Sequence, residues 1–306
     1  MKAWQPKQFG LENLRLEDSA TPKPQPHELL VKVGAVSLNS RDKAIVDGIY
    51  EPHAIPNPLI AVSDAAGRVV DVGEGVTRFK VGDRVNSHLY SRWIDGPPKP
   101  NEPAYQLGGP LPGALAEYMI LHEDSAVPVP DALSEVEAST LPIAALTAWF
   151  ALVEVGSLKP DQVILTQGTG GVSIFAAQIA QAFGAKVVAT SSSDAKLERM
   201  IASGVWRTIN YASHPDWDQV AVRLTEGIGV DHVLDVVGGR GMNQSITAAK
   251  VAGRVSAIGF LGGQLPISTS CSSCSGRRRS RSSVAGRRSS GSRSSIRRSS
   301  TASKAS

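Results

Sequence analysis

The sequence predicts an α/β protein with three parts: a β-rich domain in residues 1–125, a doubly wound parallel sheet in residues 126–267, and a disordered tail in residues 268–306. Residues 162–195 contain, in order, a strand pattern, a glycine turn, an amphipathic helix pattern and a second strand pattern. The first domain instead carries short strand patterns separated by Pro and Gly. The tail consists largely of Ser and Arg.

Mostly β structure is expected in the first domain. Its strands are predicted at residues 28–36, 66–72, 83–85 and 116–121, with a short helix near residues 40–47. Glycine-containing turns at residues 73–75 and 81–83 separate two of these strands. The Pro-rich run at residues 96–112 has few apolar side chains, so we expect a loop outside the core.

Helical patterns begin at Ser134, near the start of the second predicted domain (residues 126–267). Pro142 is tolerated there as an early helical residue, and residues 147–153 offer an apolar face. Later strands are predicted at residues 208–210, 232–237 and 254–260. The glycines at the carboxyl ends of two of them are Gly238, Gly239 and Gly259. Ligands of open parallel sheets bind at that edge.

A glycine turn follows the buried strand pattern of residues 163–165. Gly168, Gly170 and Gly171 form this turn, and apolar residues then recur at the spacing of one helical face. Without Cβ atoms, the turn lets main-chain N–H groups approach a pyrophosphate, which the helix N-terminus also attracts. Ser173, at the third glycine position of G-x-G-x-x-G, is still small enough for close packing. The pattern predicts a dinucleotide site; the alternative is a turn that only links a strand to a helix.

The second strand of this unit bears on the choice of cofactor. An NAD site usually places Asp or Glu at the end of this strand to bind the ribose 2′-hydroxyl. Here residues 190–193 are Thr-Ser-Ser-Ser, and Lys196 follows in the next helix. Hydroxyl donors and a cation suit a 2′-phosphate, so the sequence favours NADP(H) over NAD(H). In the alternative interpretation, Ser193 or Asp194 only caps the helix and Lys196 is solvated.

Charge distribution, cysteine content and the length of apolar runs together indicate the class of protein. The net charge is +4, but ten of the 32 Lys and Arg lie in residues 268–306, which contain no acid. Residues 1–267 therefore carry 22 basic against 28 acidic side chains, and no cysteine. No apolar run reaches the roughly 18 residues of a membrane helix, and residues 1–11 lack a signal-peptide core. A soluble cytoplasmic protein is expected.

The six histidines do not recur at metal-ligand spacing. His88, His122 and His232 are expected in loops or at edges rather than in a catalytic role. No Ser-His-Asp arrangement can be argued from their positions.

Three motifs together resemble the medium-chain dehydrogenase/reductase superfamily. They are residues 67–85 (Gly-Arg-Val-Val-Asp-Val-Gly-Glu-Gly and onward), residues 140–147 (Thr-Leu-Pro-Ile-Ala-Ala-Leu-Thr) and the Gly168 turn. Within the superfamily the chain is similar to the zinc-independent, quinone-oxidoreductase-like branch, over roughly residues 1–267. The resemblance implies a GroES-like catalytic domain, a Rossmann domain, hydride transfer with NAD(P)H and a homodimer.

The resemblance also identifies the positions that hold zinc in other members. Those members have a Cys, a Gly-His-Glu motif and a second Cys, whereas this chain has Asn39, Ser63-Asp64 and Ile143. Zinc needs about four N, S or O ligands, so we expect no zinc here and no Lewis-acid polarisation of an alcohol. The cysteine-rich structural zinc lobe is also missing from the sequence.

Without zinc, the resemblance implies hydride delivery from NADPH to a small molecule: a quinone, an α,β-unsaturated carbonyl (enone) or an aldehyde. The protein would orient two flat molecules and exclude water. The expected catalytic residues are Asn39, Asp42 and Tyr50, with packing as the alternative role of Tyr50. The expected cofactor-binding residues are Thr147, Gly168, Thr169, Gly170, Gly171, Val172, Ser192, Lys196, Tyr211, Gly259 and Phe260.

The tail is expected to be disordered, because its 17 Ser and 9 Arg cannot compensate the entropy of ordering by burial. Cys271 and Cys274 have metal-like spacing but no second pair. The resemblance leads us to expect a further Rossmann strand and a return to the catalytic domain, and a shifted reading frame is our hypothesis for the difference. The strand at residues 254–260 would then be an unpaired edge, with weak folding, lost dimerisation and little turnover.

A second function of a different class is also compatible with the sequence. The chain would be a non-catalytic nucleotide-binding protein whose basic tail binds nucleic acid through phosphates, with strong salt dependence. Deleting residues 268–306 would separate the two hypotheses.

Overall fold

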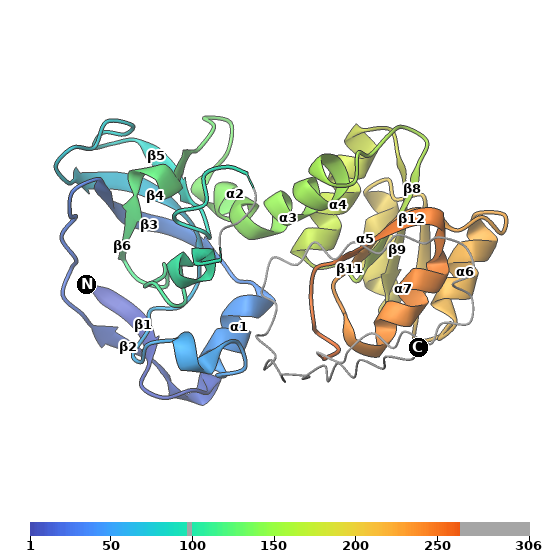
Figure 1. The fold of residues 1–306 in the computed structure, drawn as a ribbon, viewed down its shortest axis with the longest axis horizontal. Helices are drawn as coiled ribbons and strands as arrows, with labels where there is room; N and C mark the ends of the chain where they lie inside the picture. Colours follow the sequence, from blue (N-terminus) through green and yellow to red (C-terminus); the bar gives the residue numbers. More distant parts are fainter. Residues whose placement is uncertain (97–99, 264–306) are drawn as a thin grey trace, which may run out of the picture.

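The computed structural model describes residues 1–96 and 100–263. The expectations for the tail, for Cys271 and Cys274 and for a further strand lie outside these residues. Figure 1 shows two five-stranded sheets at opposite ends of the described chain, with α2 (Glu135–Ser139) and α3 (Leu146–Trp149) between them. The predicted α/β class, with one antiparallel and one parallel sheet, is confirmed.

The antiparallel sheet has the strand order β6-β3-β4-β5-β7. Its strands are β3 (Glu28–Ser37), β4 (Asp64–Val72), β5 (Arg84–Ser87), β6 (Tyr118–His122) and β7 (Ala126–Pro128). Alternate apolar side chains of these strands, such as Leu29, Val69 and Leu121, are buried in one core. The short elements around the sheet are η1 (Leu11–Asn13), α1 (Ser40–Val46), η2 (Pro52–Ala54), η3 (Glu102–Tyr105) and η4 (Glu123–Ser125).

Two features of this half differ from the sequence expectations. Strands β1 (Lys2–Pro6), β2 (Leu14–Asp18) and β7 were not predicted. Strands β1 and β2 pair with each other in a separate antiparallel ribbon, and β7 pairs with β5. The Pro-rich run does not stay outside the core, because Leu107 is buried in the core of the antiparallel sheet. In the described part of the run, Leu111 also packs against this core.

A continuous helical stretch leads from the first sheet to the second. Ser134 and Glu137 form a capping box at the start of α2, which explains why helical structure begins there. The π-helical turns η5 (Leu141–Ala145) and η6 (Phe150–Glu154) flank α3. Pro142 lies in the first turn of η5, as expected for a residue that lacks the N–H group.

The parallel sheet has the strand order β10-β9-β8-β11-β12. Its strands are β8 (Val163–Gln167), β9 (Lys186–Ser191), β10 (Arg207–Asn210), β11 (Val230–Asp235) and β12 (Ala249–Ala257). The helices are α4 (Gly171–Ala182), α5 (Asp194–Ala202), α6 (Trp217–Leu224), the short η7 (Gly239–Gly241) and α7 (Met242–Ala248). Because the chain order reverses between β8 and β11, their carboxyl ends form the switch point at which such sheets bind ligands.

Helices cover both faces of the parallel sheet. Ala176 of α4 and Met200 of α5 lie in one apolar core, and Trp217 of α6 and Met242 of α7 lie in the other. The expected loop or edge position of His232 is wrong, because this residue is buried in β11, between β8 and β12. Among the described residues β12 ends the sheet, and none of the described helices is long and apolar enough to cross a membrane.

Candidate active site

The glycine turn after β8 leaves open space in front of α4. Gly168 has φ = 72°, which favours glycine, and a Cβ placed on Gly168 or Gly170 would meet no heavy atom within 4 Å. Gly170 precedes the helix, and no side chain caps the first turn. The N–H groups of Gly171 and Val172 start a helix of 12 residues, where they have no intrahelical acceptor. A pyrophosphate therefore fits this turn.

Ser173 has a structural reason to replace the third glycine of the motif. Its buried hydroxyl donates a hydrogen bond of 2.7 Å to the carbonyl oxygen of Gln167. The serine thus ties α4 to the end of β8. Thr169 lies within the turn itself, between the two open glycines.

The end of β9 presents hydroxyl groups and a lysine. The main-chain N–H of Gly168 lies 3.4 Å from Oγ1 of Thr190. Ser192 and Lys196 are exposed, and Lys196 forms no ion pair in the described part of the chain. Tyr211, 43% exposed, donates its main-chain N–H to the carbonyl oxygen of Ser191 and so lies beside the same strand end.

The capping alternative finds little support at Ser193. This residue occupies the position before α5, but its side chain makes no capping hydrogen bond. Asp194 is engaged elsewhere, because its Oδ1 accepts a hydrogen bond of 2.6 Å from Nδ2 of Asn210.

A buried polar network at the ends of β8 and β11 was missed by the sequence analysis. Nε2 of Gln167 donates to Oγ of Ser245 (2.8 Å), which donates to Oδ2 of Asp235 (2.6 Å). Oδ1 of Asp235 accepts the N–H of Gly238 at 2.7 Å. The position of Gln167 and Asp235 at the carboxyl ends of neighbouring strands was the available signal. The network fixes the loop that follows β11.

That loop packs main chain against main chain. A Cβ on Gly238 would lie 2.7 Å from the carbonyl oxygen of Gly259, and one on Gly239 would lie 2.6 Å from that of Gly262. Both glycines have positive φ angles. The segment with Gly259 is thereby held against the end of β11, so side chains cannot be introduced at this junction without displacing the main chain.

Asn39 and Asp42 lie together at the start of α1. The main-chain N–H of Asn39 donates to Oδ2 of Asp42 at 2.7 Å. Nδ2 of Asn39 donates to Oδ2 of Asp64 at 3.0 Å, and the N–H of Ile143 donates to the same oxygen at 3.1 Å. The structure therefore brings together the three positions that the resemblance identified.

The side chains at these positions do not make a zinc-ligand set. Asn39 turns its NH₂ group to Asp64, and Ile143 has only a hydrocarbon side chain. Zinc requires about four N, S or O ligands. In residues 1–96 and 100–263 no three His, Cys, Asp or Glu side chains are grouped to hold a metal ion. Asp64 instead uses one oxygen to accept two N–H groups.

Burial has a strong effect on the two carboxyl groups. It raises the pKa of Asp64 to about 7, and the neighbouring charge of Asp42 adds to the increase, while Asn39 and Ile143 oppose it. Burial also raises the pKa of Asp42. The Oδ1 atoms of both acids, and Oγ of Ser63, are buried without a hydrogen bond from any described residue. Perturbed carboxyl groups of this kind are frequent at functional sites.

Tyr50 joins the two halves of the molecule through its ring. Its centroid lies 6.3 Å from that of Phe260, with the planes at 22°, and 5.3 Å from the guanidinium carbon of Arg41. Arg41 is held by the carbonyl oxygens of Leu107 (3.1 Å) and Gly109 (2.6 Å). Tyr50 thus has packing partners on two sides. Arg41 was missed because its partners are more than 60 residues away in sequence.

The glycine turn and the Asn39 group are connected through η5. A Cβ on Gly171 would lie 3.1 Å from Cβ of Ala144, the residue that follows Ile143. Thr147 is half-buried one turn further along, in α3. The expected pyrophosphate turn and the Asn39 group are therefore separated by only one helical turn.

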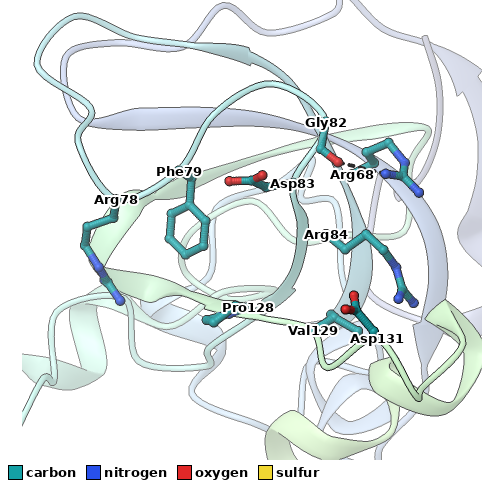
Figure 2. Close-up of a pocket in the computed structure, with 9 residues that line it drawn as sticks. All are labelled: Arg68, Arg78, Phe79, Gly82, Asp83, Arg84, Pro128, Val129 and Asp131. Atoms are coloured by element: carbon teal, nitrogen blue, oxygen red, sulfur yellow. Dashed lines mark hydrogen bonds between the residues drawn. The ribbon is translucent and has the colours of Figure 1, made fainter.

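A concave region lies on the antiparallel sheet, away from the candidate active site. Its volume is about 510 Å³. Figure 2 shows the side chains that line it, among them Arg68, Arg78 and Arg84. Arg68 and Arg78 donate to main-chain carbonyl oxygens at 2.7 Å, and Arg84 donates to that of Leu133. None of the expected site residues lines this cavity. Its arginines stabilise loops, and the cavity is separate from the candidate active site.

Two family models match the chain. The model of the alcohol dehydrogenase GroES-like domain matches residues 25–131, and the model of the zinc-binding dehydrogenase matches residues 171–297. The second match extends past residue 267, where the expected resemblance ends, and past the described residues.

Individual proteins are similar over most of the chain. A zinc-type alcohol dehydrogenase-like protein of Schizosaccharomyces pombe is 41% identical over 255 residues, which are 82% of this chain and 73% of that protein. An NAD-dependent alcohol dehydrogenase of known structure has a TM-score of 0.77 and 34% identity, over 87% of this chain and 80% of that one. Escherichia coli quinone oxidoreductase complexed with NADPH has a TM-score of 0.73 and 26% identity, over 87% and 76%.

Proposed function

The chain belongs to the medium-chain dehydrogenase/reductase superfamily of oxidoreductases, and from this membership we propose that it is an NADPH-dependent, zinc-independent reductase of quinones or α,β-unsaturated carbonyl compounds. The observation that carries the proposal is the position of Asp64. This residue joins Asn39 to η5, next to the glycine turn, with hydrogen bonds where a metal site would need ligands.

The described residues fit a nicotinamide dinucleotide with a 2′-phosphate. The open Gly168 turn suits the pyrophosphate, and β9 ends in Ser191 without a carboxylate at the expected position. Ser192, Lys196 and Tyr211 are the candidate ligands of the 2′-phosphate. When bound, NADPH supplies the hydride.

The protein itself would orient the nicotinamide and the acceptor and exclude water from between them. Asn39, held between two carboxyl groups, would orient the nicotinamide, with Thr147 below it. The ring of Tyr50, between Arg41 and Phe260, would cover one side of a flat acceptor. Such positioning converts a bimolecular step into an effectively unimolecular one.

A direct experiment is to titrate the purified chain with NADPH and NADH while following nucleotide fluorescence, and then to follow oxidation of NADPH at 340 nm with 1,4-naphthoquinone or cyclohex-2-enone. We expect NADPH to bind at least about 10-fold more tightly than NADH, since charge-assisted bonds to the 2′-phosphate contribute roughly 1.5–3 kcal/mol. A metal chelator should leave turnover unchanged. Tighter binding of NADH, or turnover that the chelator abolishes, would contradict the proposal.

The family resemblance implies a homodimer, whereas the edge strand expected at residues 254–260 would weaken dimerisation of this chain. No described residue favours the alternative of nucleic-acid binding, whose basic segment lies outside the described residues.

A further inference from the structure

Asp64 lies where three elements of the chain meet. It is the first residue of β4, it accepts the side-chain amide of Asn39 before α1, and it accepts the main-chain N–H of Ile143 in η5. Its side chain is fully buried, and both bonds end on Oδ2. The other oxygen, Oδ1, has no hydrogen-bond partner in the described part of the chain.

This arrangement determines how the Asn39 side chain is turned. An ionised carboxylate can only accept hydrogen bonds, so the NH₂ group of Asn39 must face Asp64. The carbonyl oxygen of the same amide then faces the main-chain N–H of Asp42, with which it completes the capping box of α1. The capping box and Asp64 therefore favour the same orientation of the Asn39 amide, and the opposite orientation would turn the carbonyl oxygen toward the carboxylate.

We propose that Asp64 is the positioning residue of the reductase site, which fixes the orientation of the Asn39 amide and anchors α1 to η5. The inference rests on the proposed function for its catalytic consequence, because Asn39 is the group that touches the nicotinamide there. Asp64 itself acts only through Asn39.

The charged groups that face Asp64 determine when this contact is strongest. Asp42 and Arg41, both on α1, are the ionisable neighbours, and they act on the pKa of Asp64 in opposite directions. A charge-assisted hydrogen bond is roughly twice as strong as a neutral one. Protonation of Asp64, whose pKa is about 7, would therefore weaken the contact with Asn39 and lower kcat as the pH falls from 8 to 6.

Replacements at two positions test the proposal in the full chain. In Asp64→Asn the amide oxygen can still accept both N–H groups, so we expect a modest loss of kcat, about 3- to 10-fold, and a kcat that no longer varies with pH near 7. In Asp64→Ala both bonds are lost, and we expect a loss of about 100-fold, the effect of misplacing a reacting group by about 1 Å.

A double-mutant cycle shows whether Asp64 acts through Asn39. The double variant Asn39→Ala/Asp64→Ala should be no slower than Asn39→Ala alone. Losses that multiply, or an Asp64→Asn variant that keeps the wild-type decline of kcat below pH 7, would overturn the proposal. Glu123→Gln is the matched control, because Glu123 is another buried acid that accepts main-chain N–H groups, from Thr77 and Arg78. Its kcat should equal that of the wild type.

An NMR measurement separates this inference from the proposed function. In protein labelled with ¹⁵N-asparagine, the side-chain amide of Asn39 should shift with a midpoint near pH 7 in the wild type and stay constant in Asp64→Asn. If that shift appears and no quinone or enone is reduced, the proposed function fails and the positioning role stands. If the reductase is active and the amide signal of Asn39 does not respond to protonation of Asp64, the inference fails.

Discussion

Lys196 is an exposed cation with no ion-pair partner among the described residues, in the first turn of the helix that follows β9. Lysines are common on protein surfaces, so exposure alone does not give this residue a role. Its position beside the exposed Ser192 and the half-exposed Tyr211 does, because a 2′-phosphate requires several donors within one small region.

Replacing Lys196 by Ala is therefore expected to weaken NADPH binding by about 10-fold and to leave NADH binding unchanged, since only NADPH carries the 2′-phosphate. Fluorescence titrations with both nucleotides provide the measurement. Lys159→Ala, in the loop before β8, serves as the control and should alter neither affinity. Equal losses for NADPH and NADH would assign Lys196 to the pyrophosphate or to general electrostatics.

Gly168 offers a second test at the scale of single residues. Gly168→Ala should weaken binding of both nucleotides by at least about 10-fold, because a methyl group would enter the space proposed for the pyrophosphate. The positive φ adds about 1–2 kcal/mol of strain.

A matched control isolates the effect of strain. Gly227 also has a positive φ (86°) and open space around its Cβ position, but it lies in the loop after α6. Gly227→Ala should lower the melting temperature to a similar extent and leave nucleotide affinity unchanged. Comparable affinities in Gly168→Ala and the wild type would contradict the assigned pyrophosphate site.

At the scale of elements, β11 contains a buried histidine. Burial lowers the pKa of His232 to about 4, and the nearby positive charges of Arg254 and Lys250 contribute, while Asp231 opposes them. The unfolded chain then binds more protons than the folded one between pH 6.5 and 4. The contribution of neutral His232 to stability is complete above pH 6.5 and is lost as the pH falls through this range.

His232→Gln should remove this contribution, so its melting temperature should fall less than that of the wild type between pH 7 and pH 5. The raised pKa of Asp64 makes stability increase as the pH falls over nearly the same range. The quantity to measure is therefore the difference in melting temperature between the wild type and the variant. Glu123 does not interfere, because its hydrogen bonds from Thr77 and His27 hold its pKa at about 2. Identical slopes for the two proteins would argue against a buried neutral imidazole.

At the scale of the whole molecule, β12 is the last strand of the parallel sheet among the described residues, and Val251 on it is 66% exposed. An exposed edge strand with apolar side chains favours self-association. Val251→Lys is expected to reduce concentration-dependent association, measured by sedimentation velocity, without a large change in melting temperature.

Ile228 provides the control for this prediction, because it is equally exposed (67%) and lies in the loop before β11. If Ile228→Lys reduces association as much as Val251→Lys, general surface hydrophobicity rather than the strand edge is responsible. The same measurements would test the sequence-based expectation of weak folding and lost dimerisation.

The sequence predicted most of the second domain because its signals are local. The apolar run at residues 163–165 and the three glycines after it lie within one short segment, and β8, the turn and α4 follow as expected. Burial of Leu107 was not predictable, since its core contacts are distant in the chain. The meeting of Asn39, Asp64 and Ile143 likewise leaves no local pattern and was expected only from the family resemblance.

The main-chain junction of Gly238 and Gly239 with residues 259–262 has a consequence for how this enzyme can diversify. A surface made of peptide groups offers almost nothing for mutation to vary, so selection for a different acceptor must act on neighbouring side chains such as Tyr50, which stacks on Phe260, and Arg41, which lies over the Tyr50 ring. In random libraries screened for altered acceptor preference, substitutions should therefore concentrate at these side chains and leave the glycine junction unchanged.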